Sequence, residues 1–177
     1  CRLAMGGAQE LFGLKPDMTC FGKIVGGGMP LAAYGGRRDV MSVIAPLGPV
    51  YQAGTLSGNP VAVACGLATL QLLKPSVYEQ LEQRGVQLEV GLNQSLQALS
   101  IENACVQRVG SMITLFFRNG PVRSWDDAQH ADTKRFAAWH GGMLERGIYW
   151  PPSQFEAAFV GAAHTCDDIS RTIEAAT

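Results

Sequence analysis

Residues 19–30 read Thr-Cys-Phe-Gly-Lys-Ile-Val-Gly-Gly-Gly-Met-Pro, a stretch in which a lone lysine stands between a β-prone segment and three glycines. Thr19 to Phe21 favours a short strand, and Lys23 follows its end. The nearest charged residues are Asp17 and Arg37, so Lys23 lacks the charged neighbours typical of a surface lysine. We expect this amine to lose hydration among apolar residues, which favours the free base that forms a Schiff base. A surface charge is the alternative interpretation.

A second stretch, residues 51–60, reads Tyr-Gln-Ala-Gly-Thr-Leu-Ser-Gly-Asn-Pro. Asn59 as N-cap and Pro60 at the first helical position predict the start of a helix. Free N–H groups and the positive dipole end would make that helix terminus an anion site, and Thr55 or Ser57 can add a hydroxyl donor. A plain capped turn is the alternative. Paired with a Schiff-base lysine, a phosphate site points to pyridoxal 5′-phosphate (PLP) as the cofactor.

The third candidate is Glu156, a carboxylate that stands among apolar residues. It is either an exposed loop residue or a residue held near a site. The three histidines have no metal-ligand spacing, so we interpret them as structural; they are His130, His140 and His164. The five cysteines form no short pair, so we predict neither a disulfide framework nor a metal site. Reduced thiols favour a reducing, cytosol-like compartment.

The composition is uneven along the 177 residues. The first 66 residues hold 13 of the 21 glycines but only 8 of the 29 charged residues, which indicates a region that is buried against other protein. The net charge of −1 supplies no field for nucleic acid. The apolar runs are shorter than the ~20 residues that span a bilayer. We therefore expect neither nucleic-acid nor membrane partners.

Hydrophobic periodicity and turn residues predict an alternation of strands and helices. The expected strands cover 19–21, 31–34, 106–117 (a pair or one long strand around Gly110), 148–150 and 158–161. The expected helices cover 38–44, 60–73, 76–99 and 126–146, and a last helix opens with a Thr165–Asp168 capping box. Ser76 is expected to cap its helix, and Gly147 to lie just beyond the end of another.

Three stretches of this sequence are similar to class III aminotransferases of PLP fold type I. They are GGAQELFGLKPDMTCFGKIVGGGMPLAAYGGRRDVM (6–41), GPVYQAGTLSGNP (48–60) and PPSQFEAAFVGAAHT (151–165). The resemblance implies an α/β fold. Residues 1–74 would form the trailing part of a large domain with a mostly parallel sheet, and residues 75–177 a smaller α+β domain with a truncated final helix.

The resemblance also implies roles for particular residues. Lys23 would be the catalytic residue, bound to PLP and moving protons between substrate carbons. Gly54 and Thr55 would bind the cofactor, with Thr55 reaching the phosphate in the neighbouring subunit of a homodimer. Tyr51 and Glu156 would lie at the substrate.

The finer resemblance is to the aminomutase branch of this family, which moves an amino group within one molecule. It implies an isomerase that converts glutamate 1-semialdehyde to 5-aminolevulinate for tetrapyrrole synthesis, with a pyridoxamine 5′-phosphate form in the cycle. In the family, the aspartate that pairs with the pyridine nitrogen precedes the region that opens here at Cys1. We therefore expect a piece of a longer protein, inactive alone and cytoplasmic, with a plastid left open.

Two alternatives stay open at this point. One is a class III ω-aminotransferase, although such enzymes usually carry a His-Gly pair and a Thr-Phe step where this chain has Gln-Ala-Gly-Thr-Leu at 52–56. The other is a non-catalytic fragment that only folds or dimerises.

Overall fold

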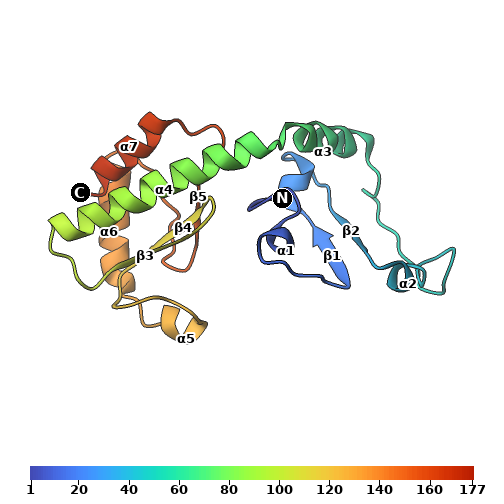
Figure 1. The fold of residues 1–177 in the computed structure, drawn as a ribbon, viewed down its shortest axis with the longest axis horizontal. Helices are drawn as coiled ribbons and strands as arrows, with labels where there is room; N and C mark the ends of the chain where they lie inside the picture. The colour runs from blue at the N-terminus through green and yellow to red at the C-terminus, as the bar shows by residue number, and fades with distance from the viewer. The chain divides into compact units, whose positions relative to one another are not determined.

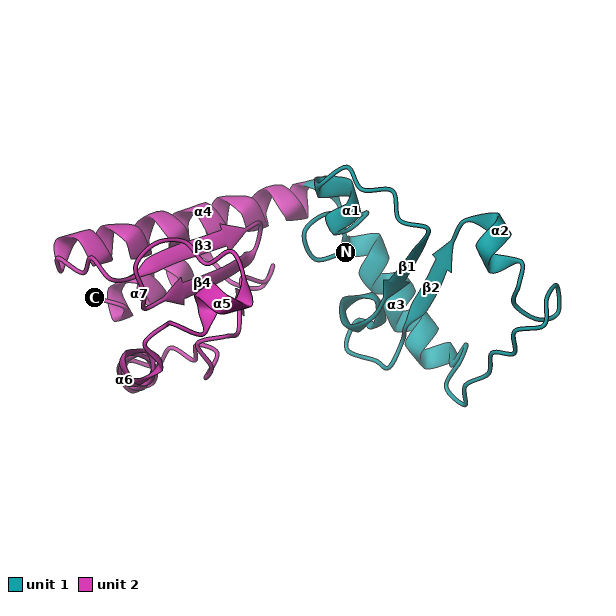
Figure 2. Ribbon diagram, turned by 90° about the horizontal axis from the view of Figure 1, so that it is seen from below, with its two compact units in different colours: residues 1–75 teal, residues 76–177 magenta.

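The computed structural model describes residues 1–177, which form two compact units, residues 1–75 and residues 76–177 (Figure 2). The elements of the first unit are α1 (Ala8–Leu11), β1 (Met18–Phe21), η1 (Lys23–Gly26), β2 (Ala33–Gly36), α2 (Arg38–Met41) and α3 (Pro60–Leu72). Those that follow are α4 (Pro75–Ala98), β3 (Cys105–Val109), β4 (Met112–Phe116), α5 (Trp125–Ala128), α6 (Thr133–Glu145), β5 (Ala158–Phe159) and α7 (Cys166–Ala175) (Figure 1).

The first unit contains one regular ladder, the antiparallel pair of β1 and β2. Its register joins Met18 to Gly36 and Phe21 to Ala33. The strand near 19–21 is confirmed, and the second strand begins two residues later than expected. The two strands that this chain supplies to the expected large-domain sheet pair antiparallel. The short η1 connection reverses the chain direction, whereas parallel neighbours need a long crossover.

Helix α3 packs against the η1 turn. The helix carries no charged residue, and its buried positions are Ala62 and Gly66, while Val25 and Gly26 are the buried positions of η1. Asn59 is the N-cap, and its side chain accepts hydrogen bonds from the first free N–H groups of the helix. The predicted Asn-Pro helix start is confirmed. This packing holds the turn that begins with the candidate lysine.

The second unit is a three-stranded antiparallel sheet with the order β3-β4-β5, packed with three helices. β3 and β4 form a hairpin around Gly110, whose φ is +56°, which confirms the strand-pair form of the expectation for 106–117. One cluster unites buried side chains of α4, β4, α6, β5 and α7. Its members include Leu88, Leu92, Ile113, Leu115, Phe117, Phe136, Met143, Trp150, Ala158, Val160 and Ile169.

Two helix boundaries differ from the sequence expectation. α4 begins at Pro75, so Ser76 lies inside its first turn and does not cap it. Proline at the first helical position needs no N–H partner, which explains the earlier start. The single helix expected over 126–146 is two helices. The first ends at Ala128, and Asp132 caps the second by accepting from the N–H groups of Lys134 and Arg135 at 3.1 and 3.0 Å.

The end of the second unit confirms two local signals and overturns a third. Gly147 follows α6 with φ +80°, and Thr165 with Asp168 forms the capping box of α7. Residues 148–150 form no strand. The Ile148 N–H instead donates to the Met143 carbonyl at 2.9 Å, which keeps this segment on the end of α6. No single helix is long and apolar enough to cross a membrane, although α3 and α4 counted together pass that test.

Candidate active site

Lys23 occupies an unusual backbone conformation. It opens η1 with φ +54°, in the left-handed region that residues with a side chain rarely adopt. This conformation costs about 1–2 kcal/mol for an L-residue, so neighbouring contacts must hold it. The two residues that complete the turn, Val25 and Gly26, are buried against α3 and supply those contacts. Strained residues of this kind cluster at functional sites.

The side chain of Lys23 is exposed and makes no hydrogen bond or ion pair. The expected loss of hydration is therefore wrong for this chain. The reason lies in the neighbours, because Gly22 and the glycines at 26–28 carry no side chains that cover the amine. The result is a primary amine with no partner in this chain, presented by a turn that packs against α3.

The two glycines after η1, Gly27 and Gly28, have different roles. Gly27 has φ +58°, and a Cβ there would lie 2.2 Å from Thr69 Oγ1 and 3.0 Å from the Cys65 carbonyl oxygen. Only glycine fits this close approach to α3. Gly28 has φ +94° with no atom within 4 Å of a Cβ position. Its backbone is therefore open to another molecule.

The amino terminus of α3 is less free than the sequence suggested. The N–H groups of Val61 and Ala62 both donate to Asn59 Oδ1 at 3.1 Å, and Val63 donates to the Asn59 carbonyl at 2.9 Å. Pro60 has no N–H. The expectation of free helix N–H groups for a phosphate is therefore wrong, because the helix satisfies them itself.

Donors remain in the preceding turn. The Ser57 N–H donates to the Gly54 carbonyl at 3.0 Å, and Gly58 at φ +69° completes the turn into the helix. Within the chain, the hydroxyl of Thr55 and the N–H groups of Thr55 and Leu56 donate no hydrogen bond, and both residues are exposed. The turn at 54–58 thus offers a phosphate the hydroxyls of Thr55 and Ser57 and at least two amides.

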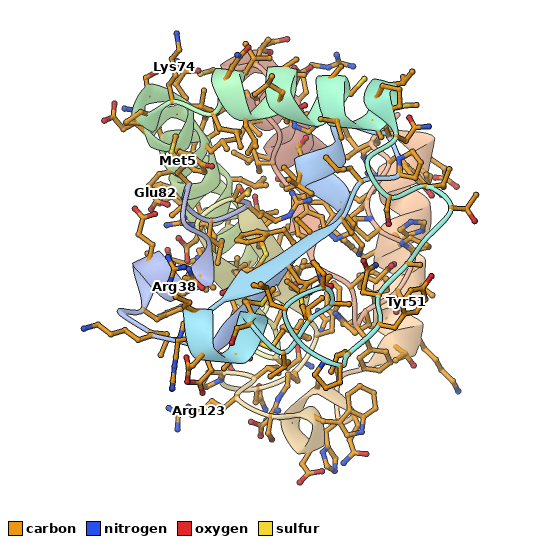
Figure 3. All side chains as sticks on the ribbon, turned by 90° about the vertical axis from the view of Figure 1, so that its right-hand side faces the viewer. Met5, Arg38, Tyr51, Lys74, Glu82 and Arg123 are labelled. Atoms are coloured by element: carbon orange, nitrogen blue, oxygen red, sulfur yellow. The ribbon has the colours of Figure 1, made fainter.

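Tyr51 lies on the loop between α2 and α3 (Figure 3) and is 83% exposed. It shares this loop with Gly54 and Thr55. The structure therefore places Lys23, Tyr51, Gly54 and Thr55 all within the first unit.

Glu156 belongs to the second unit, in the loop before β5. It is exposed, and its N–H donates to the Ser153 carbonyl at 3.1 Å. Its carbonyl accepts from Thr114 Oγ1 at 3.4 Å. Glu156 also lines an open cavity of about 750 Å³, together with Tyr149 and Phe159. Glu156 is thus an exposed loop residue, as one interpretation of the sequence predicts, and it also borders a cavity.

The histidines make local contacts that suit structural roles. His130 Nδ1 lies 2.5 Å from the Asp126 carbonyl, and His140 Nε2 lies 2.8 Å from the Trp150 carbonyl. His164 Nδ1 accepts from the Gly161 N–H at 2.8 Å. No three His, Cys, Asp or Glu side chains are placed to hold a metal ion.

Sequence reasoning missed Gln154, a side chain that is only 2% exposed. Its neighbours Ser153, Phe155 and Glu156 drew attention, but glutamine is usually a surface residue. The available signal was its place between two prolines and the apolar residues of β5. Its buried amide contacts strand β4, as developed below.

Comparison with known proteins places this architecture in a family. The family model for class III aminotransferases matches residues 5–151, and the chain belongs to this family. A curated relative, glutamate-1-semialdehyde 2,1-aminomutase of Sorangium cellulosum, is 69% identical over 175 residues, covering 99% of this chain and 40% of the relative.

Solved structures agree with this assignment. A β-phenylalanine aminotransferase from Variovorax paradoxus superposes with a TM-score of 0.89 and 33% identity, over 98% of this chain and 40% of that protein. A transaminase with PLP bound gives a TM-score of 0.84 and 27% identity, over 99% of this chain and 40% of that one. The chain therefore spans about two fifths of the length of the curated relatives and solved structures that it matches.

Proposed function

We propose that the complete protein carrying this chain is a PLP-dependent aminomutase that converts glutamate 1-semialdehyde to 5-aminolevulinate. The observation that carries the proposal is the Lys23 turn, an unpartnered amine held in a left-handed conformation. It occurs in a chain that is 69% identical to a curated aminomutase.

The residues present fit the cofactor. PLP has an aldehyde, which needs a free primary amine, and a phosphate, which needs hydrogen-bond donors. Lys23 supplies the primary amine, and no carboxylate of this chain pairs with it. The turn that contains Thr55 supplies the hydrogen-bond donors, since the Thr55 hydroxyl and the N–H groups of Thr55 and Leu56 donate to no group of this chain. Bound PLP supplies an electron sink that stabilises negative charge on a carbon next to the substrate nitrogen.

Each residue then has a definite task. The Nζ atom of Lys23 would hold the cofactor covalently, and as a free amine it would take a proton from one substrate carbon and return it to the next. The Thr55 hydroxyl would donate to the phosphate, and Gly54 would bind the cofactor from the same turn. Tyr51 and Glu156 would each contact the substrate in the complete protein.

The assembly and location belong to the same proposal. In a homodimer, Thr55 would serve the phosphate of the neighbouring subunit. Residues 51–58 around it are all exposed within this chain, which leaves Thr55 accessible to a second subunit. We also propose a reducing, cytoplasm-like compartment, because Cys20, Cys65, Cys105 and Cys166 form no disulfide.

The test is an assay of the complete protein with PLP and glutamate 1-semialdehyde, with no amino donor or keto acid added. An aminomutase forms 5-aminolevulinate under these conditions, because the amino group stays within one substrate molecule. Turnover that requires an added amino donor would instead identify an ω-aminotransferase. No turnover under either condition, with PLP bound, would contradict both activities.

A further inference from the structure

Gln154 is the most deeply buried polar side chain of the second unit, and both ends of its amide are hydrogen-bonded. Its Oε1 accepts from the Phe117 N–H at 3.2 Å, and its Nε2 donates to the Leu115 carbonyl at 2.8 Å. Both partners are backbone groups on the same edge of β4 and its extension. A buried N–H or C=O that loses its partner is costly, so this side chain has a structural reason to stay.

The register of the sheet explains what the amide replaces. β5 pairs with β4 through Met112–Phe159 and Ile113–Ala158. Continued at the same antiparallel register, this pairing would bring position 154 opposite Phe117. The main chain has left the ladder by that point, and the Gln154 amide makes the hydrogen bonds that a strand backbone would make.

Because the Gln154 amide takes the place of strand backbone beside β4, the main chain of residues 153–156 is free to turn away from the sheet. The Phe155 N–H donates to Ser153 Oγ at 3.2 Å, and the Glu156 N–H donates to the Ser153 carbonyl at 3.1 Å. In a strand, neighbouring side chains point to opposite faces. In this turn, Phe155 and Glu156 are both exposed, and the Phe155 ring lies 5.2 Å from the ring of Trp125.

We propose that Gln154 is a positioning residue that places Glu156 at the substrate by substituting for a strand at the edge of β4. The inference rests on the proposed function, because it takes Glu156 to line the substrate site. Gln154 acts through the loop and does not itself touch substrate.

The substitution Gln154→Glu gives a pH-dependent test. A protonated glutamic acid reproduces both bonds, since its O–H donates to the Leu115 carbonyl and its C=O accepts from the Phe117 N–H. An ionised carboxylate cannot donate a hydrogen bond, and it repels the Leu115 carbonyl oxygen. Burial disfavours the charged form and so raises the pKa of the introduced carboxyl group. We expect kcat/KM of the complete variant, divided by that of the unsubstituted protein, to fall at least about tenfold from pH 6 to pH 9.

The effect on kcat/KM of titrating the surrounding charged groups cancels in this ratio, because both proteins carry these groups. They are Arg118 and its partner Asp127, Arg135 over the Phe117 ring, His140 on the adjacent helix, and Glu156 itself. Leu92→Ala is the control for general destabilisation, since Leu92 is 2% exposed in the same core, lies on α4 and introduces no titratable group beside the Gln154 amide. Its ratio should stay flat across the pH range.

Amide hydrogen exchange at Phe117 is a readout that needs no cofactor. Protection of the Phe117 N–H should be lost in Gln154→Leu. If that variant does not fold, Gln154→Glu at pH 9 takes its place and should show the same loss. Protection should return in Gln154→Glu at pH 6. Protection of the Phe117 N–H that is unchanged in these variants would contradict the claim that the Gln154 amide takes the place of strand backbone. Lost protection with an unchanged kcat/KM ratio would overturn the positioning role. An unsubstituted protein that is inactive on glutamate 1-semialdehyde would instead contradict the proposed function, and with it the placement of Glu156 at the substrate.

Discussion

Gly66 of α3 and Val25 of η1 are packed so closely that a Cβ atom on Gly66 would lie 2.6 Å from the Val25 carbonyl oxygen. The same atom would lie 2.4 Å from Cδ2 of Leu31. Val25 is two residues beyond Lys23, so this contact holds the turn that presents the amine. The exposed lysine owes its fixed position to a glycine in a helix far along the sequence.

Gly66→Ala should therefore disturb the Lys23 turn. Overpacking of this kind typically costs about 1–3 kcal/mol, and we expect a lower melting temperature and less covalently attached cofactor in the complete protein. Gly35→Ala is the matched control, because no atom lies within 4 Å of its Cβ position and its φ is not in the left-handed region. Equal behaviour of the two variants would contradict the account of the turn.

Thr55→Val should weaken PLP binding and leave the fold intact. The change removes one hydroxyl donor to a charged phosphate, worth about 1–3 kcal/mol, and keeps the shape of the side chain. The dissociation constant of PLP, measured by titration of the apoprotein, should rise by about 5- to 150-fold. Ser57→Ala serves as the control, and a larger effect there would move the phosphate contact to Ser57.

The ion pairs of Arg108 predict an acid dependence of the second unit. Arg108 donates to both carboxylate oxygens of Glu82 at 2.9 Å and to Glu89 at 2.8 Å. The hydrogen bond from Arg108 lowers the pKa of Glu82. A carboxyl whose folded pKa is lowered adds stability above its unfolded value of about 4.3, and this is lost as the pH falls through the folded value.

We therefore expect the free energy of unfolding to fall less steeply below about pH 5 in Glu82→Gln than in the unsubstituted chain. Urea unfolding followed by helix circular dichroism at several pH values measures this slope. Glu79→Gln is the control on the same helix, since Glu79 makes no ion pair. A slope that flattens equally in both variants would contradict the role of the Arg108 pair.

The two units should differ in resistance to proteases. In the first unit the buried apolar side chains are Val25 and Ala62, while large apolar residues such as Leu47, Phe12 and Leu72 are 82%, 60% and 70% exposed. The second unit holds the rest of the buried core. Limited proteolysis of the 177-residue chain should cut residues 1–75 first and leave a resistant product from about Ser76 onward. Uniform resistance across the chain would contradict this.

Signals that act within one turn of the chain could be predicted from the sequence. Asn59 with Pro60, Gly147, and the Thr165–Asp168 pair each satisfy backbone groups only a few residues away. The sequence patterns therefore determine them locally. The candidate residues Lys23 and Thr55 were also recognisable from their neighbours.

Features that depend on distant partners could not be predicted in this way. The left-handed conformation of Lys23 depends on the contact of η1 with α3, about 40 residues later. Gln154 bonds to β4, and Gln107 bonds in the same manner to both backbone groups of Val122. In each case a side chain stands in for a strand. Hydrophobic periodicity along the sequence does not indicate where a side-chain amide takes the place of strand backbone.

Borohydride reduction of the complete protein with PLP, followed by peptide mapping, tests the central claim most directly, because it fixes the cofactor to the amine that holds it. We predict the added mass on the peptide containing Lys23, and on none containing Lys15, Lys74 or Lys134, the other lysines of this chain. In Lys23→Ala the added mass should disappear. Label on another of these lysines, or an undiminished label in Lys23→Ala, would contradict the account.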